Sequence, residues 1–236
     1  MTALLIDLSF SASSTALQPI SGNFRSTLPM SEPAVGAVIV NHINELEAAL
    51  RYAHSTMEPM LEKAVANVME EKRHELGWAG EAPADFDETQ WLAPEEWRMD
   101  GAVANDDFYL SFVLDTRSCI DGNEPETWVG TIAGFAGAGI SLSAATDALK
   151  QRPWKALMKS QRALLDELVG KGFLCDPKTG DIALTISINR EDLAAGFEDV
   201  SLETALEPIV VAIERINTAR PELDRLVDAI KQNADK

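Results

Sequence analysis

The segment GFLCDPKTGDIALTISI (residues 172–188) has the pattern of a β-hairpin, and it decides the fold class. Hydrophobic side chains alternate along residues 182–188, which places them on one face of a strand. The turn DPKTGD combines Asp-Pro with Gly180, and this combination favours a type I turn closed by a left-handed residue. Strands joined by so short a turn are antiparallel, so the segment predicts an antiparallel sheet.

A first hairpin is predicted upstream of this one. FYLSFVLD (residues 108–115) alternates in the same way, and residues 127–135 are its expected partner strand. Amphipathic helices are predicted around the hairpins, at residues 43–76, 154–168, just after Asn189, 202–216 and 223–230. The predicted fold class is therefore α+β: an antiparallel sheet built from two β-hairpins, packed against amphipathic helices in the order α-β-β-α-β-β-α-α.

The longest predicted helix carries a heptad pattern. Apolar residues recur at three- and four-residue spacing, at Ile43, Leu46, Leu50, Ala53, Met57, Met60 and Ala64. Pro59 lies inside this pattern, so a kink or break is expected near it. Gly77 is the expected end of the helix. This row of apolar residues has two interpretations. It either packs the helix into the core of the protein or forms a surface through which two copies associate.

The chain is expected to form one domain behind a leader. Residues 1–36 are rich in Ser, Thr, Pro and Gly and are predicted to be a flexible N-terminal leader, and residues 37–236 a single α+β domain. Asp7 interrupts the early apolar stretch and no base precedes Arg25, unlike a secretory signal. The two cysteines stand apart and indicate a reducing compartment. The uncharged residues 127–146 contain too much Gly, Ser and Ala for a membrane span. We expect a cytoplasmic protein.

Charge narrows the possible partners. The 236 residues include 38 acids and 20 bases, a formal net charge of −18. Sixteen acids and four bases lie between Glu70 and Glu126, so this stretch carries −12 of the imbalance. Phosphate contacts need clustered Lys and Arg, so we expect neither direct nucleic-acid binding nor adhesion to an anionic membrane. A basic protein partner is the expectation that the charge favours.

Motifs for catalysis fail at residues that their chemistry requires. HELGW (residues 74–78) has Trp78 where a zinc helix needs its second histidine, and GFAGAG (residues 134–139) lacks the lysine of a phosphate loop. We therefore predict no catalytic residue, metal ligand or cofactor. The enzymatic alternative is a metal-dependent hydrolase or nuclease using carboxylates around the first hairpin: Asp107, Asp115, Glu124 and Glu126.

Aromatic rings within the acidic stretch are the candidate partner-binding residues. They are interleaved with acids, and the predicted site consists of Trp78, Phe86, Trp91, Glu95, Glu96 and Trp97. Tryptophan is enriched at interface hot spots, and surrounding acids steer a basic partner. The alternative is that these rings pack against the core and thereby hold a long loop in place.

A basic stripe complements the acidic stretch. Arg152, Lys155, Lys159 and Arg162 follow helical spacing opposite the apolar face of their helix. The stripe is either a solvated face or a surface that meets the acidic stretch, within one molecule or between two. The second interpretation predicts association that weakens as salt is added.

Two resemblances bear on function. The order of elements from about residue 57 to 217, with the hairpin LLDELVGKGFLCDPKTGDIALTISINREDL (residues 164–193), resembles the small acidic chaperones of type III secretion. That resemblance implies a dimeric, non-enzymatic protein that binds clients. The −12 block is similar to acidic inhibitors that imitate nucleic acid, such as phage counter-defence proteins. The sequence thus predicts a non-enzymatic regulatory protein, chaperone- or inhibitor-like and possibly a homodimer, that binds a basic macromolecule. A purely structural dimer is a further alternative.

Overall fold

A computed structural model describes residues 32–102, 104, 107–117, 119 and 124–234 of the chain. By its internal contacts the chain divides into two units, Met1–Asn44 and Glu45–Lys236. Of the predicted leader, residues 1–31 lie outside the described residues, and residues 32–36 begin helix α1 (Glu32–Asn41). Within the described chain, no helix combines the length and the hydrophobicity needed to cross a membrane.

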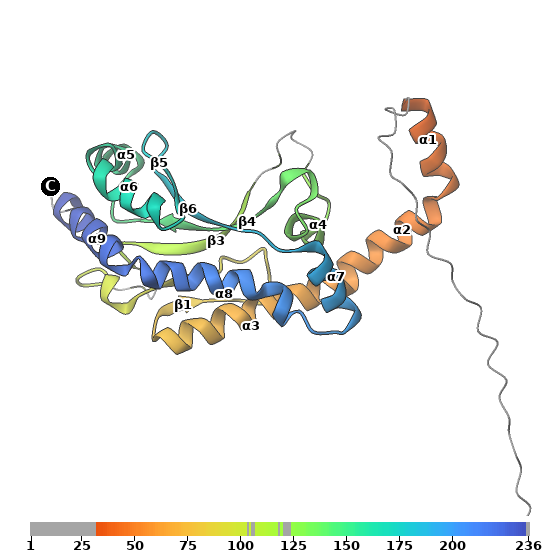
Figure 1. Cartoon of the computed structure of the whole chain (residues 1–236), viewed down its shortest axis with the longest axis horizontal. Coiled ribbons are helices and arrows are strands. Elements are labelled where there is room, and N and C mark those ends of the chain that lie inside the picture. The colour runs from red at the N-terminus through yellow and green to blue at the C-terminus, as the bar shows by residue number, and fades with distance from the viewer. Residues whose placement is uncertain (1–31, 103, 105–106, 118, 120–123, 235–236) are drawn as a thin grey trace, which may run out of the picture. The chain divides into compact units, whose positions relative to one another are not determined.

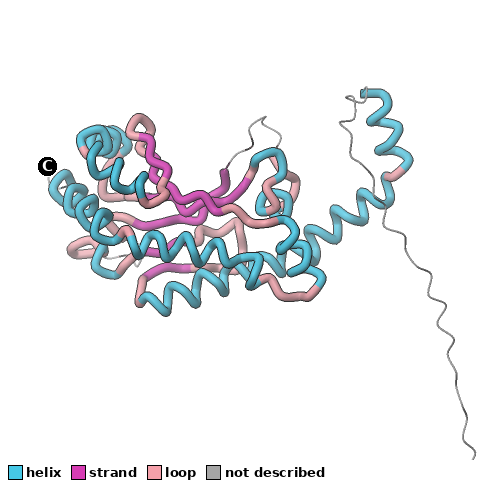
Figure 2. Tube along the Cα trace, viewed as in Figure 1, coloured by secondary structure: helices cyan, strands magenta, loops and turns pink. Residues whose placement is uncertain are grey.

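The larger unit is an α+β fold with an antiparallel sheet, as the sequence predicted (Figures 1 and 2). The sheet has six strands. The strand order across the sheet is β1-β2-β3-β4-β6-β5. The strands are β1 (Ala79–Glu81), β2 (Trp91–Ala93), β3 (Ser111–Arg117), β4 (Gly139–Ala145), β5 (Leu174–Asp176) and β6 (Asp181–Ile186). The other helices are α2 (Ile43–Tyr52), α3 (Glu58–Leu76), α4 (Trp128–Ile132), α5 (Gln151–Ser160), α6 (Arg162–Gly170), α7 (Arg190–Glu198), α8 (Glu203–Thr218) and α9 (Arg220–Ala234).

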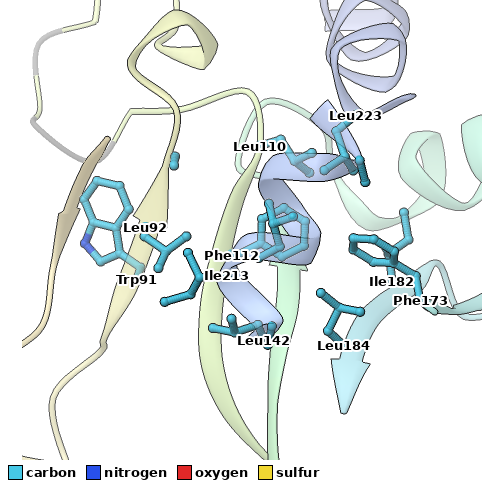
Figure 3. Packing of buried hydrophobic residues seen from close by; sticks show 14 of the residues in the cluster. Trp91, Leu92, Leu110, Phe112, Leu142, Phe173, Ile182, Leu184, Ile213 and Leu223 are labelled. Carbon is cyan, nitrogen blue, oxygen red and sulfur yellow. The ribbon is translucent and has the colours of Figure 1, made fainter. Parts of the chain in front are cut away.

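One face of the sheet forms the core with the helices. Register pairs Phe112 with Ala144 and Leu142 with Leu184, so their side chains share that face. Figure 3 shows Phe112 and Leu142 beside Ile213 of α8, which crosses this face. The residues of this layer that are labelled in the figure are almost fully buried. Helix α8 therefore covers this side of β3, β4 and β6, as expected where a strand has one apolar face.

Local signals read from the sequence are confirmed at several element ends. The hairpin β5–β6 closes through Gly180, whose φ is 92° and whose N–H donates to the Asp176 carbonyl at 2.7 Å. A side chain at Gly180 would meet the indole nitrogen of Trp154, which donates to the Gly180 carbonyl at 3.0 Å. Asn189 caps α7 through its side-chain oxygen, and Gly77 ends α3 with a φ of 64°.

The expected distortion near Pro59 is a π-helical turn. Residues Ala53–Met57 form this turn, and the Glu58 N–H donates five residues back to the Ala53 carbonyl. Pro59 has no N–H, and its ring clashes with the carbonyl four residues earlier in a regular helix. The wider turn avoids this clash, so the chain passes from α2 to α3 without a loop.

Two parts of the predicted sheet need correction. Residues 127–135 are not a strand: Thr127 accepts a hydrogen bond from the Gly130 N–H and caps α4, and the partner of β3 is β4. The acidic stretch also contributes β1 and β2, which extend the sheet beyond the two predicted hairpins. A side-chain cap competes successfully with strand propensity at Thr127 because it satisfies a helix-end N–H.

Candidate functional site

The second face of the sheet is left open by the helices. The register aligns Asp115 with Ser141 and Thr185 in one row, and Val113 with Ser143 and Ala183 in the next. We call this surface, with Leu174 and Asp176 of β5 and Asp181 of β6, the open face. Its centre is built from small side chains, so nothing large stands between β3 and the β5–β6 hairpin.

A groove of about 840 Å³ lies over the open face. Residues of β3, β4, β5 and β6 line it, and no helix contributes to the lining. In its floor Ser141 is buried and Ser143 and Ala183 are half-buried, whereas Leu174 at the hairpin edge is 60% exposed. The volume lies within the range of pockets that enclose organic ligands, and it is large enough for several side chains of a partner.

Carboxylates dominate the rim of the groove. Asp115, Asp176 and Asp181 are exposed there, and none of the three forms an ion pair among the described residues. Register places Asp176 directly opposite Asp181, a pairing of like charges that disfavours the hairpin. Arg117, whose guanidinium lies against Gly139, is the base that lines the groove. The rim therefore presents an excess of negative charge.

The rim acid Asp176 is held in its ionised form. A hydrogen bond from the Lys178 backbone N–H lowers the pKa of the Asp176 carboxyl, with smaller contributions from Thr179. The bond measures 2.8 Å and belongs to the hairpin turn. The same turn that closes the second hairpin thus also maintains negative charge at the edge of the groove.

Two serines of β4 contribute hydroxyl groups to the floor of the groove. The Ser141 and Ser143 hydroxyls lie 3.2 Å apart and hydrogen-bond to each other along β4. Neither has a histidine partner in the described structure, and a nucleophilic serine requires an adjacent base. The floor therefore offers contact area and hydrogen bonds to a bound chain.

The structure corrects the prediction that tryptophans form an exposed anchor surface. Trp78, Trp91 and Trp97 are 4%, 8% and 2% exposed, so all three rings belong to the core. Trp97 donates its indole N–H to Asp224 of α9 at 2.7 Å. Trp91 packs against Phe108, with ring centroids 5.3 Å apart. Their positions agree with the alternative interpretation, in which the rings pack into the core and hold the acidic segment against it.

The remaining predicted site residues are also engaged within the fold. Phe86 is half-buried and its ring centroid lies 4.4 Å from that of Trp128. Glu95 pairs with Arg98 in the 3-10 turn η2 (Glu95–Trp97), and Glu96 pairs with Arg220 of α9 at 2.9 Å. These side chains do not assemble into one free surface.

The basic stripe lies on α5 and at the start of α6. Arg152, Lys159 and Arg162 are exposed and Lys155 is half-buried. Within the described part of the chain none of the four forms an ion pair with an acid. An intramolecular pairing with the acidic stretch is therefore not seen there.

Carboxylates near the first hairpin do not converge. Among the described residues, no group of three or more His, Cys, Asp or Glu side chains is arranged to hold a metal ion. Glu58 accepts hydrogen bonds from the Trp128 N–H at 2.6 Å and from His54 at 2.7 Å. These polar groups join α3 to α4 and stabilise the fold.

Sequence reasoning missed the open face. The sequence does contain a signal for this face, in the residues that lie between the core residues of each strand. These are Val113 and Asp115 of β3, Ser141 and Ser143 of β4, and Thr185 of β6. The small size of these side chains on neighbouring strands indicated a shallow surface above the sheet backbone. No family model matches the chain, and neither does any curated protein or solved structure.

Proposed function

We propose that this protein is a non-catalytic binding protein that takes a basic, apolar segment of another protein into the groove over the open face. The observation that carries the proposal is the combination of a small-residue floor with a rim of carboxylates that have no described ion-pair partner. This is the kind of activity that the resemblance to secretion chaperones implies.

Charge supports a basic partner. The rim acids Asp115, Asp176 and Asp181 outnumber Arg117, and the chain as a whole carries −18. A lysine or arginine placed between Asp176 and Asp181 relieves the repulsion of two carboxylates that oppose each other across the hairpin. The long-range field also raises the rate at which a basic chain arrives.

Shape supports an apolar segment between the bases. The row Val113, Ser143, Ala183 and Leu174 crosses four strands, and its members present methyl and methylene groups to the groove. Because these side chains are short, an approaching helix or strand comes close to the sheet backbone. Leu174 provides exposed apolar area at the edge where such a segment enters.

The test uses two synthetic peptides with the same leucines, one carrying lysines and the other glutamates. We expect the full chain to bind the lysine peptide and not the glutamate peptide, as measured by fluorescence anisotropy. The triple variant Asp115→Asn, Asp176→Asn, Asp181→Asn is expected to weaken binding by about tenfold, since exposed charges contribute modestly and add up.

The matched control removes three exposed acids elsewhere, with Glu198→Gln, Asp199→Asn and Glu207→Gln. It has the same net charge as the triple rim variant, so an equal loss of affinity in both contradicts binding in the groove. Ala183→Trp fills the floor from a half-buried position and is expected to abolish binding while thermal stability is retained. Undiminished binding by this variant also contradicts the proposal.

A further inference from the structure

Helix α2 presents an apolar stripe that the described chain does not cover. Ile43, Leu46 and Leu50 are 43%, 49% and 39% exposed, and no residue of α2 is buried. Farther along the same helical run the environment changes, because Leu61 and Val65 of α3 are fully buried in the core. The heptad pattern therefore continues past the point where the core ends.

A helix in this situation needs a cover. A ten-residue helix is marginal in water on its own, and most helical stability in proteins comes from packing of an amphipathic face. Contiguous exposed apolar surface of this kind marks a site of association. Isoleucine and leucine at three- and four-residue spacing form the kind of apolar stripe through which helices pair with one another.

The charges of α2 make it complementary to itself in the antiparallel direction. Glu45 and Glu47 lie in its first half and Arg51 in its second half, and none of the three forms an ion pair among the described residues. In an antiparallel pair that crosses at the level of Ala48, Glu47 and Arg51 lie on the same flank of the apolar stripe, so Glu47 of each helix lies toward Arg51 of the other. Ala49 borders the apolar stripe near the crossing, and its short side chain leaves room for close approach.

We propose that α2 pairs with α2 of a second copy of this chain, antiparallel and about a two-fold axis, with Leu46 of each copy against Leu50 of the other. Such an interface is isologous and closes as a dimer. It lies on a different surface from the groove, so it stands independently of the proposed function.

The first experiment measures the mass of the full chain by sedimentation equilibrium over a range of concentrations. We expect a dimer whose dissociation constant rises by about two orders of magnitude in Leu46→Glu, Leu50→Glu, since each charge is placed in an apolar interface. Val169→Glu is the control, because Val169 is 51% exposed on α6 and lies outside the apolar stripe. A control that dissociates equally contradicts the proposal.

The second experiment fixes the direction of pairing. In the antiparallel arrangement Ile43 of one copy lies opposite Ala53 of the other. We expect a mixture of the Ile43→Cys and Ala53→Cys chains to form disulfide-linked dimers on mild oxidation, whereas each variant alone remains unlinked, as does the wild-type chain.

Three results overturn the proposal. Cross-linking of each cysteine variant with itself indicates parallel helices. A wild-type chain that is monomeric at every concentration, with α2 amides protected from hydrogen exchange, indicates that residues 1–31 or another part of the same chain cover the stripe. A dimer that survives the double glutamate variant unchanged places the interface elsewhere.

Discussion

Single side chains in this protein have strongly different environments, and Cys175 is the clearest case. Burial raises the pKa of the Cys175 thiol to about 11, and the negative charge of Asp166 adds to the shift. Both effects disfavour the thiolate, which is the form that reacts. Cys175 is therefore a structural thiol, although it lies on the edge strand β5.

We predict that Cys175 is nearly inert toward a disulfide reagent at pH 8. In a Cys119→Ala background, the folded chain is expected to react about 100-fold more slowly than the same chain in denaturant, since a shift of two pKa units lowers the thiolate fraction by that factor. The rate should rise about tenfold per pH unit until the pH approaches 11. Rapid reaction of the folded chain at pH 8 contradicts this assignment.

Lys72 shows how a charge is accommodated inside the fold. Its side chain is almost fully buried, and its ammonium pairs with Glu75 on its own helix and with Glu214 on α8. The hydrogen bond to Glu214 makes the largest contribution to raising the pKa of Lys72 above its ordinary value. The stability from this pairing is therefore complete below the unfolded-state pKa and is lost only as the pH rises through the folded-state value.

The acidic segment is held against the rest of the fold by its aromatic rings. The 3-10 turn η2 packs on α9 through Trp97, whose indole N–H donates to Asp224 and whose ring lies 5.5 Å from the Arg220 guanidinium carbon. Trp97 also lies near Phe112 of β3, with centroids 6.5 Å apart. One residue thus joins the segment, the sheet and the last helix.

We predict that Trp97→Ala lowers the free energy of unfolding by about 3–5 kcal/mol, the cost of emptying a large buried site. Denaturant titration followed by circular dichroism measures this loss. Binding of the lysine peptide per folded molecule is expected to be unchanged, because Trp97 does not line the groove. A folded variant with normal stability and lost binding would restore the interface interpretation of this ring.

For the whole molecule, the core is confined to the larger unit. Every described hydrophobic residue that is buried follows residue 60, beginning with Leu61. The division between units falls after Asn44, so the larger unit keeps its complete sheet and the helices that cover it. The stability of the fold therefore does not depend on the residues before Glu45.

We predict that a chain of residues 45–236 unfolds cooperatively. Its thermal midpoint is expected to lie within about 3 °C of the full chain at concentrations where both are monomers, a shift that corresponds to roughly 1 kcal/mol in a domain of this size. Calorimetry checks the midpoint and the cooperativity. A broad transition, or a much lower midpoint, contradicts the independence of the larger unit.

The predictions that succeeded concern structures stabilised by interactions between residues close together in the sequence. The β5–β6 hairpin, the cap at Asn189 and the end of α3 at Gly77 depend on interactions within a few residues, and all were read correctly. The strands β1 and β2 were missed because each has only three residues, too few to show an alternation, and is stabilised by pairing with a neighbouring strand rather than by its own sequence pattern. Residues 127–135 were misread because the Thr127 cap outweighed an apolar alternation.

The α+β class, the amphipathic helices, the second hairpin and the excess of negative charge could be predicted from the sequence, because periodicity, turn chemistry and charge are properties of neighbouring residues or of composition. The packing of the folded chain was needed to show that the tryptophans are interior, that one face of the sheet stays open and that the apolar residues of α2 are exposed in the described chain. Burial depends on which distant elements pack together. A tryptophan occurs in the same local sequence pattern whether its ring is covered by the protein's own core or by a partner.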